Sequence, residues 1–253
     1  MMGICSRIIR ENSFVNPDIG PINEIADIDI FVISPPKCAT TSIQRGFERL
    51  GHKVLHAHND LTTHDAFANG AILRRHGVGL LRLIEARQAT SRRPAFFFCG
   101  YREVVAWYLS LAGQFGLPMT DDLTVDVPSA LDLKMPWKNY SFEEPRRILE
   151  AATGLGMTGA RAENGVCIQT KGRATLVFYR ADRTDVVAQF IRSRIDPGFE
   201  NRRERENADP AYAEFRARFR LPEPVLRRFY SDPVHAFFYK AEETETLVAT
   251  YAA

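Results

Sequence analysis

The chain has 253 residues, of which 45% are hydrophobic and 25% are charged, which are ordinary values for a globular protein. Lys and Arg number 33 against 31 Asp and Glu, so the formal net charge is only +2. This composition excludes a disordered chain, a collagen-like chain and a coiled coil. It also lacks the basic excess of a protein that coats nucleic acid, so we expect no nucleic-acid partner and only a local anion site.

Four cysteines are spread along the chain without a CxxC pair, which favours reduced thiols over a disulfide framework or a zinc site. They are Cys5, Cys38, Cys99 and Cys167. The first residues lack the apolar core of a secretion signal, and no stretch approaches the ~20 apolar residues of a membrane helix. These features predict a cytoplasmic protein without an integral membrane segment.

The first strong element is the apolar, β-branched run at residues 28–33, which is typical of a buried strand. Two prolines end it, and residues 40–50 are then predicted to form a helix that Gly51 closes. Strands and helices continue to alternate: strand 53–56, helix 71–88, strand 95–101 and helix 104–115. This alternation indicates βαβ units around a parallel sheet.

The second half of the chain departs from this alternation. Residues 118–142 contain three prolines and are predicted to form a loop insertion. A hairpin at residues 166–179, whose second strand enters the core, a helix at 185–195 and short helices from 210 onward are expected to follow. We therefore predict an N-terminal extension at 1–27 and a single domain at 28–253. Its fold class is α/β, a three-layer domain with a central parallel sheet flanked by helices and a helical C-terminal part.

The junction between the first strand and the first helix carries the strongest functional signal. A helix start offers unpaired N–H groups and the positive end of a dipole. Thr40 and Thr41 add hydroxyl groups at this start, and Lys37 adds a mobile positive charge. The same pattern also fits a capped helix with a surface lysine. A Walker P-loop would need G-x-x-x-x-G-K-[ST], so a nucleotide triphosphatase is disfavoured. The segment is Ser34-Pro35-Pro36-Lys37-Cys38-Ala39-Thr40-Thr41-Ser42.

Within this segment, Pro36-Lys37-Cys38-Ala39-Thr40-Thr41 resembles the Pro-Lys-x-Gly-Thr-Thr loop of sulfotransferases that use 3′-phosphoadenosine 5′-phosphosulfate (PAPS). Ala39 stands where the family has glycine. The family also carries an arginine after a later strand and a serine eight residues on. Arg102 and Ser110 have that spacing, although Val104 replaces the usual proline. Looser patterns from 126 to 251 resemble the bacterial branch for capsular polysaccharide synthesis.

This resemblance implies a P-loop-like fold and transfer of a sulfuryl group from PAPS to a hydroxyl of a carbohydrate or glycolipid, in the synthesis of a capsular or other surface polysaccharide. Residues 36–42 would hold the 5′-phosphate, with Lys37 acting on the leaving oxygen. Arg102 and Ser110 would hold the 3′-phosphate, and no metal is required. The cofactor-binding residues expected on this basis are Pro36, Lys37, Cys38, Ala39, Thr40, Thr41, Ser42, Arg102 and Ser110.

His56 and His58 are the candidates for the base that takes the acceptor's proton, because histidine has a suitable pKa. They flank Ala57 at the end of the second strand, so alternation puts both rings on one side. We expect His58 to be the base and His56 to be held within the fold. Both residues also fit polar positions that merely finish a strand, and His64 and Asp65 are weaker candidates.

Several other residues have a structural interpretation beside a functional one. Cys38 is expected to be a small spacer first and an oxidation-sensitive thiol second, Trp107 and Tyr108 are expected to pack their helix, and Trp137 is a candidate for stacking on a sugar. The arginine run at 192–205 favours a solvated face over a cover for the nucleotide. It comprises Arg192, Arg194, Arg202, Arg203 and Arg205.

Two other functions stay open at the level of the sequence. A kinase-like phosphoryl transferase would need an acidic motif that holds Mg²⁺, which we do not identify in the sequence. A non-catalytic nucleotide- or glycan-binding protein of a capsule assembly pathway is the second alternative, against which the retained Lys37 and His58 argue. The acceptor sugar and the oligomeric state are left open.

Overall fold

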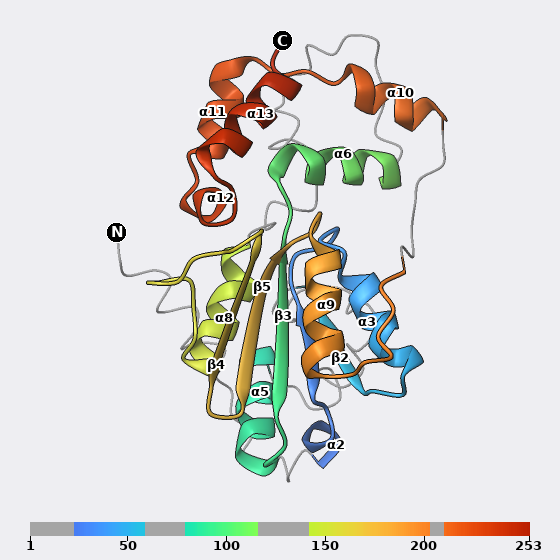
Figure 1. Ribbon diagram of the computed structural model, residues 1–253, viewed down its shortest axis with the longest axis vertical. Coiled ribbons are helices and arrows are strands. Elements are labelled where there is room, and N and C mark those ends of the chain that lie inside the picture. The colour runs from blue at the N-terminus through green and yellow to red at the C-terminus, as the bar shows by residue number, and fades with distance from the viewer. Residues whose placement is uncertain (1–22, 59–78, 116–141, 203–209) are drawn as a thin grey trace.

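A five-stranded sheet forms the centre of the computed structural model, which describes residues 23–58, 79–115, 142–202 and 210–253 (Figure 1). The strand order is β2-β1-β3-β5-β4. Neighbouring strands run parallel except β4, which pairs antiparallel with β5. The strands are β1 (Ile30–Ile33), β2 (Val54–Ala57), β3 (Ala95–Tyr101), β4 (Val166–Lys171) and β5 (Ala174–Arg180). The α/β class and the hairpin are therefore as predicted.

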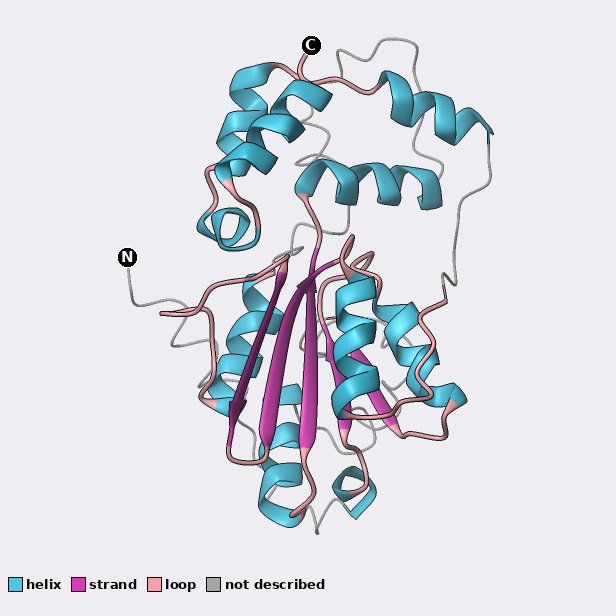
Figure 2. Ribbon diagram, viewed as in Figure 1, coloured by secondary structure: helices cyan, strands magenta, loops and turns pink. Residues whose placement is uncertain are grey.

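Helices cover both faces of this sheet, which explains why its strands are apolar on both sides (Figure 2). In β3, Phe97 stacks on Phe31 in one layer, whereas the next residue, Phe98, contacts Phe47 in the other. The first layer includes α2 (Asn23–Ala26), α5 (Leu80–Thr90) and α8 (Glu143–Thr153), and the second includes α3 (Thr40–Arg49) and α9 (Thr184–Arg194). This arrangement is consistent with a three-layer α/β fold.

A third apolar cluster lies beyond the carboxyl ends of the parallel strands, where α6 (Val104–Phe115) meets the C-terminal helices (Figure 1). Trp107, Tyr108 and Leu109 of α6 pack there with Leu226 and Tyr230, among others. The C-terminal helices are α10 (Pro210–Arg218), α11 (Glu223–Tyr230), α12 (Pro233–Phe238) and α13 (Ala241–Tyr251). The helical C-terminal part therefore lies over the edge of the sheet at which β1 and β3 end.

Two helices were not predicted from the sequence. Pro145 lies in the first turn of α8, where proline is tolerated, and the helix buries Ile148 and Leu149. The short helix α2 lies inside the expected N-terminal extension, and its Ile25 is fully buried, so the packed chain begins before residue 28. Of the predicted helix at 71–88, the residues before Gly79 lie outside the described segments, as does all but the last residue of the 118–142 insertion.

None of the helices in the described segments combines the length and the apolar character that crossing a bilayer requires. The longest of them, α6, has 12 residues, whereas a membrane span needs about 20. Val105, Trp107, Tyr108 and Leu109 of α6 pack against the C-terminal helices instead.

Candidate functional site

The loop that joins β1 to α3, residues 34–39, has a strained backbone. Lys37 and Ala39 adopt φ values of 68° and 61°, in the left-handed region that a residue with a Cβ rarely enters. Ala39 is the N-cap residue of α3 and provides no side-chain cap. The position where the sulfotransferase pattern has glycine is thus one where glycine would relieve strain. Such a conformation persists only when the surrounding structure holds it.

Three consecutive carbonyls of this loop accept hydrogen bonds from side chains of other elements. Trp107 Nε1 donates to Pro36 O at 3.1 Å, Arg102 Nη1 to Lys37 O at 2.9 Å, and Tyr179 Oη to Cys38 O at 3.0 Å. Because C=O and N–H point in opposite directions in a trans peptide, the N–H groups of residues 37–39 point away from these donors. Successive N–H groups at a helix start are suited to bind an anion.

Arg102 belongs to the second sulfotransferase-like motif, the pair Arg102 and Ser110, and it contacts the loop that carries the first motif. It follows β3 directly, is half-buried, and reaches a loop residue 65 positions earlier in the chain. Ser110 lies half-buried within α6, eight residues beyond Arg102. The structure therefore brings Arg102 to the loop and places Ser110 on the helix that begins beside it.

Glu103 fixes the start of that helix, a role we did not predict from the sequence. Its two carboxylate oxygens accept the N–H groups of Val105 and Ala106 at 2.7 and 2.8 Å, and Tyr230 Oη donates to it at 2.8 Å. Burial raises the pKa of the Glu103 carboxyl, while these hydrogen bonds and the charge of Arg102 oppose the shift. An acidic residue just before a helix is a capping signal that sequence analysis could have used.

The two histidines lie side by side at the end of β2. His56 and His58 have ring centroids 4.6 Å apart in an edge-to-face arrangement, so alternation does place them on one side. His56 is buried and its Nδ1 bonds Gln44 Oε1, while the Gln44 amide donates to Glu48 at 2.8 Å. His58 is half-buried, and its Nδ1 lies 2.9 Å from Ser34 O, at the start of the loop.

The tautomer of His58 follows from this contact. A backbone carbonyl can only accept, so Nδ1 carries the proton and the lone pair of the neutral ring is on Nε2. Ser34 is the first residue of the loop at residues 34–39, which we call the anion loop because its N–H groups are suited to bind an anion. The structure thus joins one nitrogen of His58 to this segment and makes the other nitrogen the potential base.

The remaining predicted residues have the following positions. Cys38 is fully buried, as a spacer should be. Thr40 is buried, whereas Thr41 and Ser42 are half-buried in the first turn of α3. Trp107 and Tyr108 pack α6 as predicted. Arg192, Arg194 and Arg202 are exposed, which favours the solvated face. His64, Asp65, Trp137, Arg203 and Arg205 lie outside the described residues.

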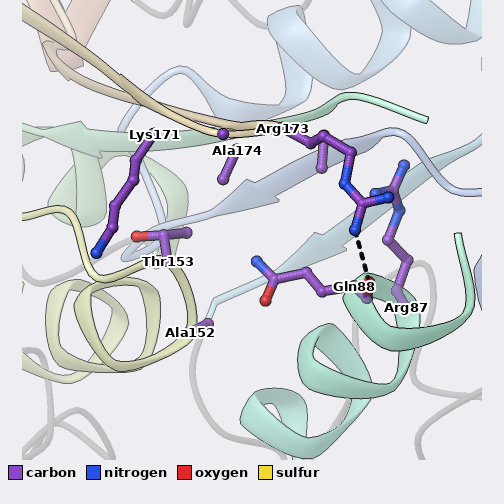
Figure 3. Close-up of a pocket in the computed structure, with 9 residues that line it drawn as sticks. Arg87, Gln88, Ala152, Thr153, Lys171, Arg173 and Ala174 are labelled. Carbon is purple, nitrogen blue, oxygen red and sulfur yellow. Dashed lines mark hydrogen bonds between the residues drawn. The ribbon is translucent and has the colours of Figure 1, made fainter. Parts of the chain in front are cut away.

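A cavity of about 230 Å³ lies at the other end of the sheet, beside the start of β3 and the β4–β5 turn (Figure 3). Lys171 and Arg173 line it, together with Arg87 and Thr153. Arg87 is buried and already bonded to three backbone carbonyls and to Asp29. Arg87 thus gives four of its five N–H groups to partners within the fold, which indicates a structural role for this residue.

No family model, no curated protein and no solved structure matches this chain in the comparisons with known proteins. The geometry offers a strained loop at a helix start, an arginine bound to that loop and a histidine joined to its first residue.

Proposed function

We propose that this protein is a PAPS-dependent sulfotransferase with a P-loop-like fold, which sulfates a carbohydrate or glycolipid hydroxyl. One observation carries the proposal: Arg102 Nη1 lies 2.9 Å from Lys37 O, so the two phosphate motifs meet although 65 residues separate them. Neither motif would be specific alone. The two motifs meet at the carboxyl edge of a mostly parallel sheet. Open α/β folds bind their ligands at this edge.

Different parts of the site would hold the two ends of the nucleotide. The N–H groups at the start of α3, together with Thr40 and Thr41, would bind the 5′-phosphate. Arg102 and Ser110 would bind the 3′-phosphate, for which a guanidinium offers a charge-assisted, forked contact. Arg102 has further N–H donors beyond the one given to Lys37 O, so it can serve the loop and a phosphate together.

The proposed transfer needs a base and a stabilised leaving group. His58 Nε2 would take the proton of the acceptor hydroxyl, whose oxygen forms a bond to sulfur. The bond between sulfur and the 5′-phosphate oxygen breaks at the same time, and the nucleotide leaves with that electron pair. Lys37 would neutralise the negative charge that develops on this oxygen, so preorganised charge supplies the catalysis.

Calorimetry with 3′-phosphoadenosine 5′-phosphate, AMP and Mg²⁺–ATP tests the cofactor assignment. We expect the bisphosphate to bind roughly 10- to 150-fold more tightly than AMP, the worth of one charge-assisted contact of ~1.5–3 kcal/mol. Since both ligands carry the 5′-phosphate, the ratio isolates the 3′-phosphate. Arg102→Ala should abolish most of this preference. Equal affinities would overturn the assignment, and a preference for Mg²⁺–ATP would favour the kinase-like alternative.

Single-turnover transfer of labelled sulfate from PAPS to a capsule-type glycan tests the reaction. Lys37→Ala should keep the fold yet lower transfer by ~10²–10³-fold, the scale of losing one preorganised donor. Lys53→Ala is the matched control, because Lys53 is exposed and pairs with Asp27 away from the loop. Tight binding of the bisphosphate without any transfer would point to the non-catalytic alternative.

A further inference from the structure

Tyr179 on β5 lies under the anion loop and was not singled out by the sequence. Its side chain is fully buried, and its hydroxyl donates to Cys38 O at 3.0 Å. The loop is seated on Gly100 of β3, the register partner of Tyr179. A Cβ at Gly100 would lie 2.7 Å from both Cys38 O and Tyr179 Cζ. Phenol, glycine backbone and loop carbonyl are therefore in direct contact.

The contact fixes one particular peptide unit. Cys38 O and the N–H of Ala39 belong to the same trans peptide, so a carbonyl directed at Tyr179 sends that N–H to the opposite side. Ala39 is the left-handed N-cap residue of α3, and its N–H belongs to the helix start where an anion would bind. Rotation of this peptide would replace a donor by a carbonyl oxygen, which repels a phosphate.

The tyrosine is suited to hold this orientation. Its ring is packed among apolar residues of the second layer, including Val177 and Val187, so the hydroxyl has a fixed position. Burial raises the pKa of Tyr179 well above its usual value, so the phenol remains a neutral donor at all working pH values. The other two donors, Trp107 and Arg102, come from the β3–α6 segment, so Tyr179 is the donor that β5 contributes.

We propose that Tyr179 is a positioning residue of the anion loop: its hydroxyl, seated against Gly100, orients the Cys38–Ala39 peptide so that its N–H faces a bound phosphate. The identity of that phosphate as part of PAPS rests on the proposed function, whereas the orientation of the peptide does not. Tyr179 acts through the backbone and need not touch the ligand.

The test compares Tyr179→Phe, which removes only the hydroxyl, with the unmodified protein. Crystal structures of both without ligand should show the Cys38–Ala39 peptide rotated in the variant. Calorimetry should show about 5- to 20-fold weaker binding of 3′-phosphoadenosine 5′-phosphate, the effect of losing one hydrogen bond that fixes a donor. Thr153→Val is the matched control. It also loses a buried hydroxyl bond, 2.7 Å to Leu149 O, but at the far end of the sheet, and should leave the affinity unchanged.

Gly100→Ala provides a second variant should Tyr179→Phe fail to fold. The added methyl group would displace either Cys38 O or the tyrosine ring, and we expect a similar loss of affinity. An unrotated peptide with unchanged affinity in Tyr179→Phe would overturn the proposal. If the unmodified protein does not bind the bisphosphate, the proposed function fails, and the peptide orientation in the variant crystal still decides the role of Tyr179.

Discussion

Ala39 combines a strained backbone with a place in the proposed anion site. A residue with a Cβ in the left-handed region costs roughly 1–2 kcal/mol compared with a relaxed backbone. The hydrogen bonds that Trp107, Arg102 and Tyr179 donate to the loop carbonyls help to offset this cost. The loop thus keeps a conformation suited to anions without the glycine found in the sulfotransferase pattern.

Replacing Ala39 by glycine should therefore stabilise the protein. We expect the free energy of unfolding to rise by ~0.5–1 kcal/mol, because relief of strain exceeds the larger entropy of glycine in the unfolded chain. Denaturant unfolding measures this change. Ala151→Gly, at an exposed position within α8, should instead cost ~1 kcal/mol. Equal destabilisation by both changes would mean that the backbone of Ala39 is unstrained.

The two histidines should respond differently to removal. His58→Ala should leave nucleotide affinity nearly unchanged but lower turnover by ~10²–10⁴-fold, the usual contribution of a general base. His56→Ala should mainly lower thermal stability, because His56 is buried and bonded to Gln44. An active His58→Ala variant would place the base elsewhere.

At the scale of elements, α6 connects the site to the C-terminal helices. Its start is held by the buried Glu103, which also accepts a hydrogen bond from Tyr230 of α11. One turn further, Trp107 packs against the C-terminal helices and bonds the loop through its indole N–H. A shift of α11 would consequently displace the start of α6, and with it Arg102 and the loop that Trp107 bonds.

Tyr230→Phe tests the connection between α11 and α6, because Tyr230 Oη bonds Glu103 at the start of α6. The change removes a hydrogen bond to a buried carboxylate, so we expect the free energy of unfolding to fall by ~1.5–3 kcal/mol. Tyr108→Phe is the control, because the Tyr108 ring packs on Phe219 and should lose much less. Both variants are compared by denaturant unfolding. Similar small losses would show that Tyr230 contributes only its ring.

At the scale of the whole molecule, an aromatic and charged cluster attaches the C-terminal helices to the sheet. His235 is fully buried and stacks between Tyr230 and Tyr239, with ring centroids 4.6 and 4.5 Å away. The guanidinium of Arg180, at the end of β5, lies 3.7 Å from the Tyr239 ring centre and pairs with Glu243 of α13 at 2.6 Å. Protonation of His235 would place a second positive charge near Arg180 in this buried cluster.

The pKa of His235 is accordingly lowered from 6.5 to about 4, first by burial and then by the charge of Arg180, with Glu243 opposing. Between pH 6.5 and 4 the unfolded chain binds a proton that the folded protein resists, so stability falls as the pH falls through this range. The total loss should be about 3 kcal/mol. Urea unfolding at a series of pH values measures it.

His235→Phe supplies the comparison, because a phenyl ring preserves the stack between the tyrosines. Its stability should depend less on pH than that of the unmodified protein across this interval. The carboxylates titrate in both proteins, so the difference between the two curves isolates the histidine. Parallel curves would show that His235 is protonated as easily in the folded state as in the unfolded chain.

Local sequence patterns determined the elements of this fold. The apolar runs of β1 and β3, the hairpin that ends in β5 and the short C-terminal helices all follow from composition over a few residues. The positions of the two motifs, each at a strand–helix junction, follow in the same way. Helix α8 was not predicted from the sequence, although its Pro145 lies in the first turn, where proline fits.

Only the tertiary structure decided how these pieces form a site. Arg102 bonds Lys37, 65 positions earlier in the chain, and Tyr179 bonds Cys38, 141 positions earlier. The residues that neighbour them in the sequence do not indicate either contact. The role of Gly100 likewise appears only when the loop is packed against it. Periodicity reports which side of an element is buried, whereas a hydrogen bond depends on where the strand order brings its partners. For that reason the sequence could suggest the chemistry of the loop but not the residues that hold it in place.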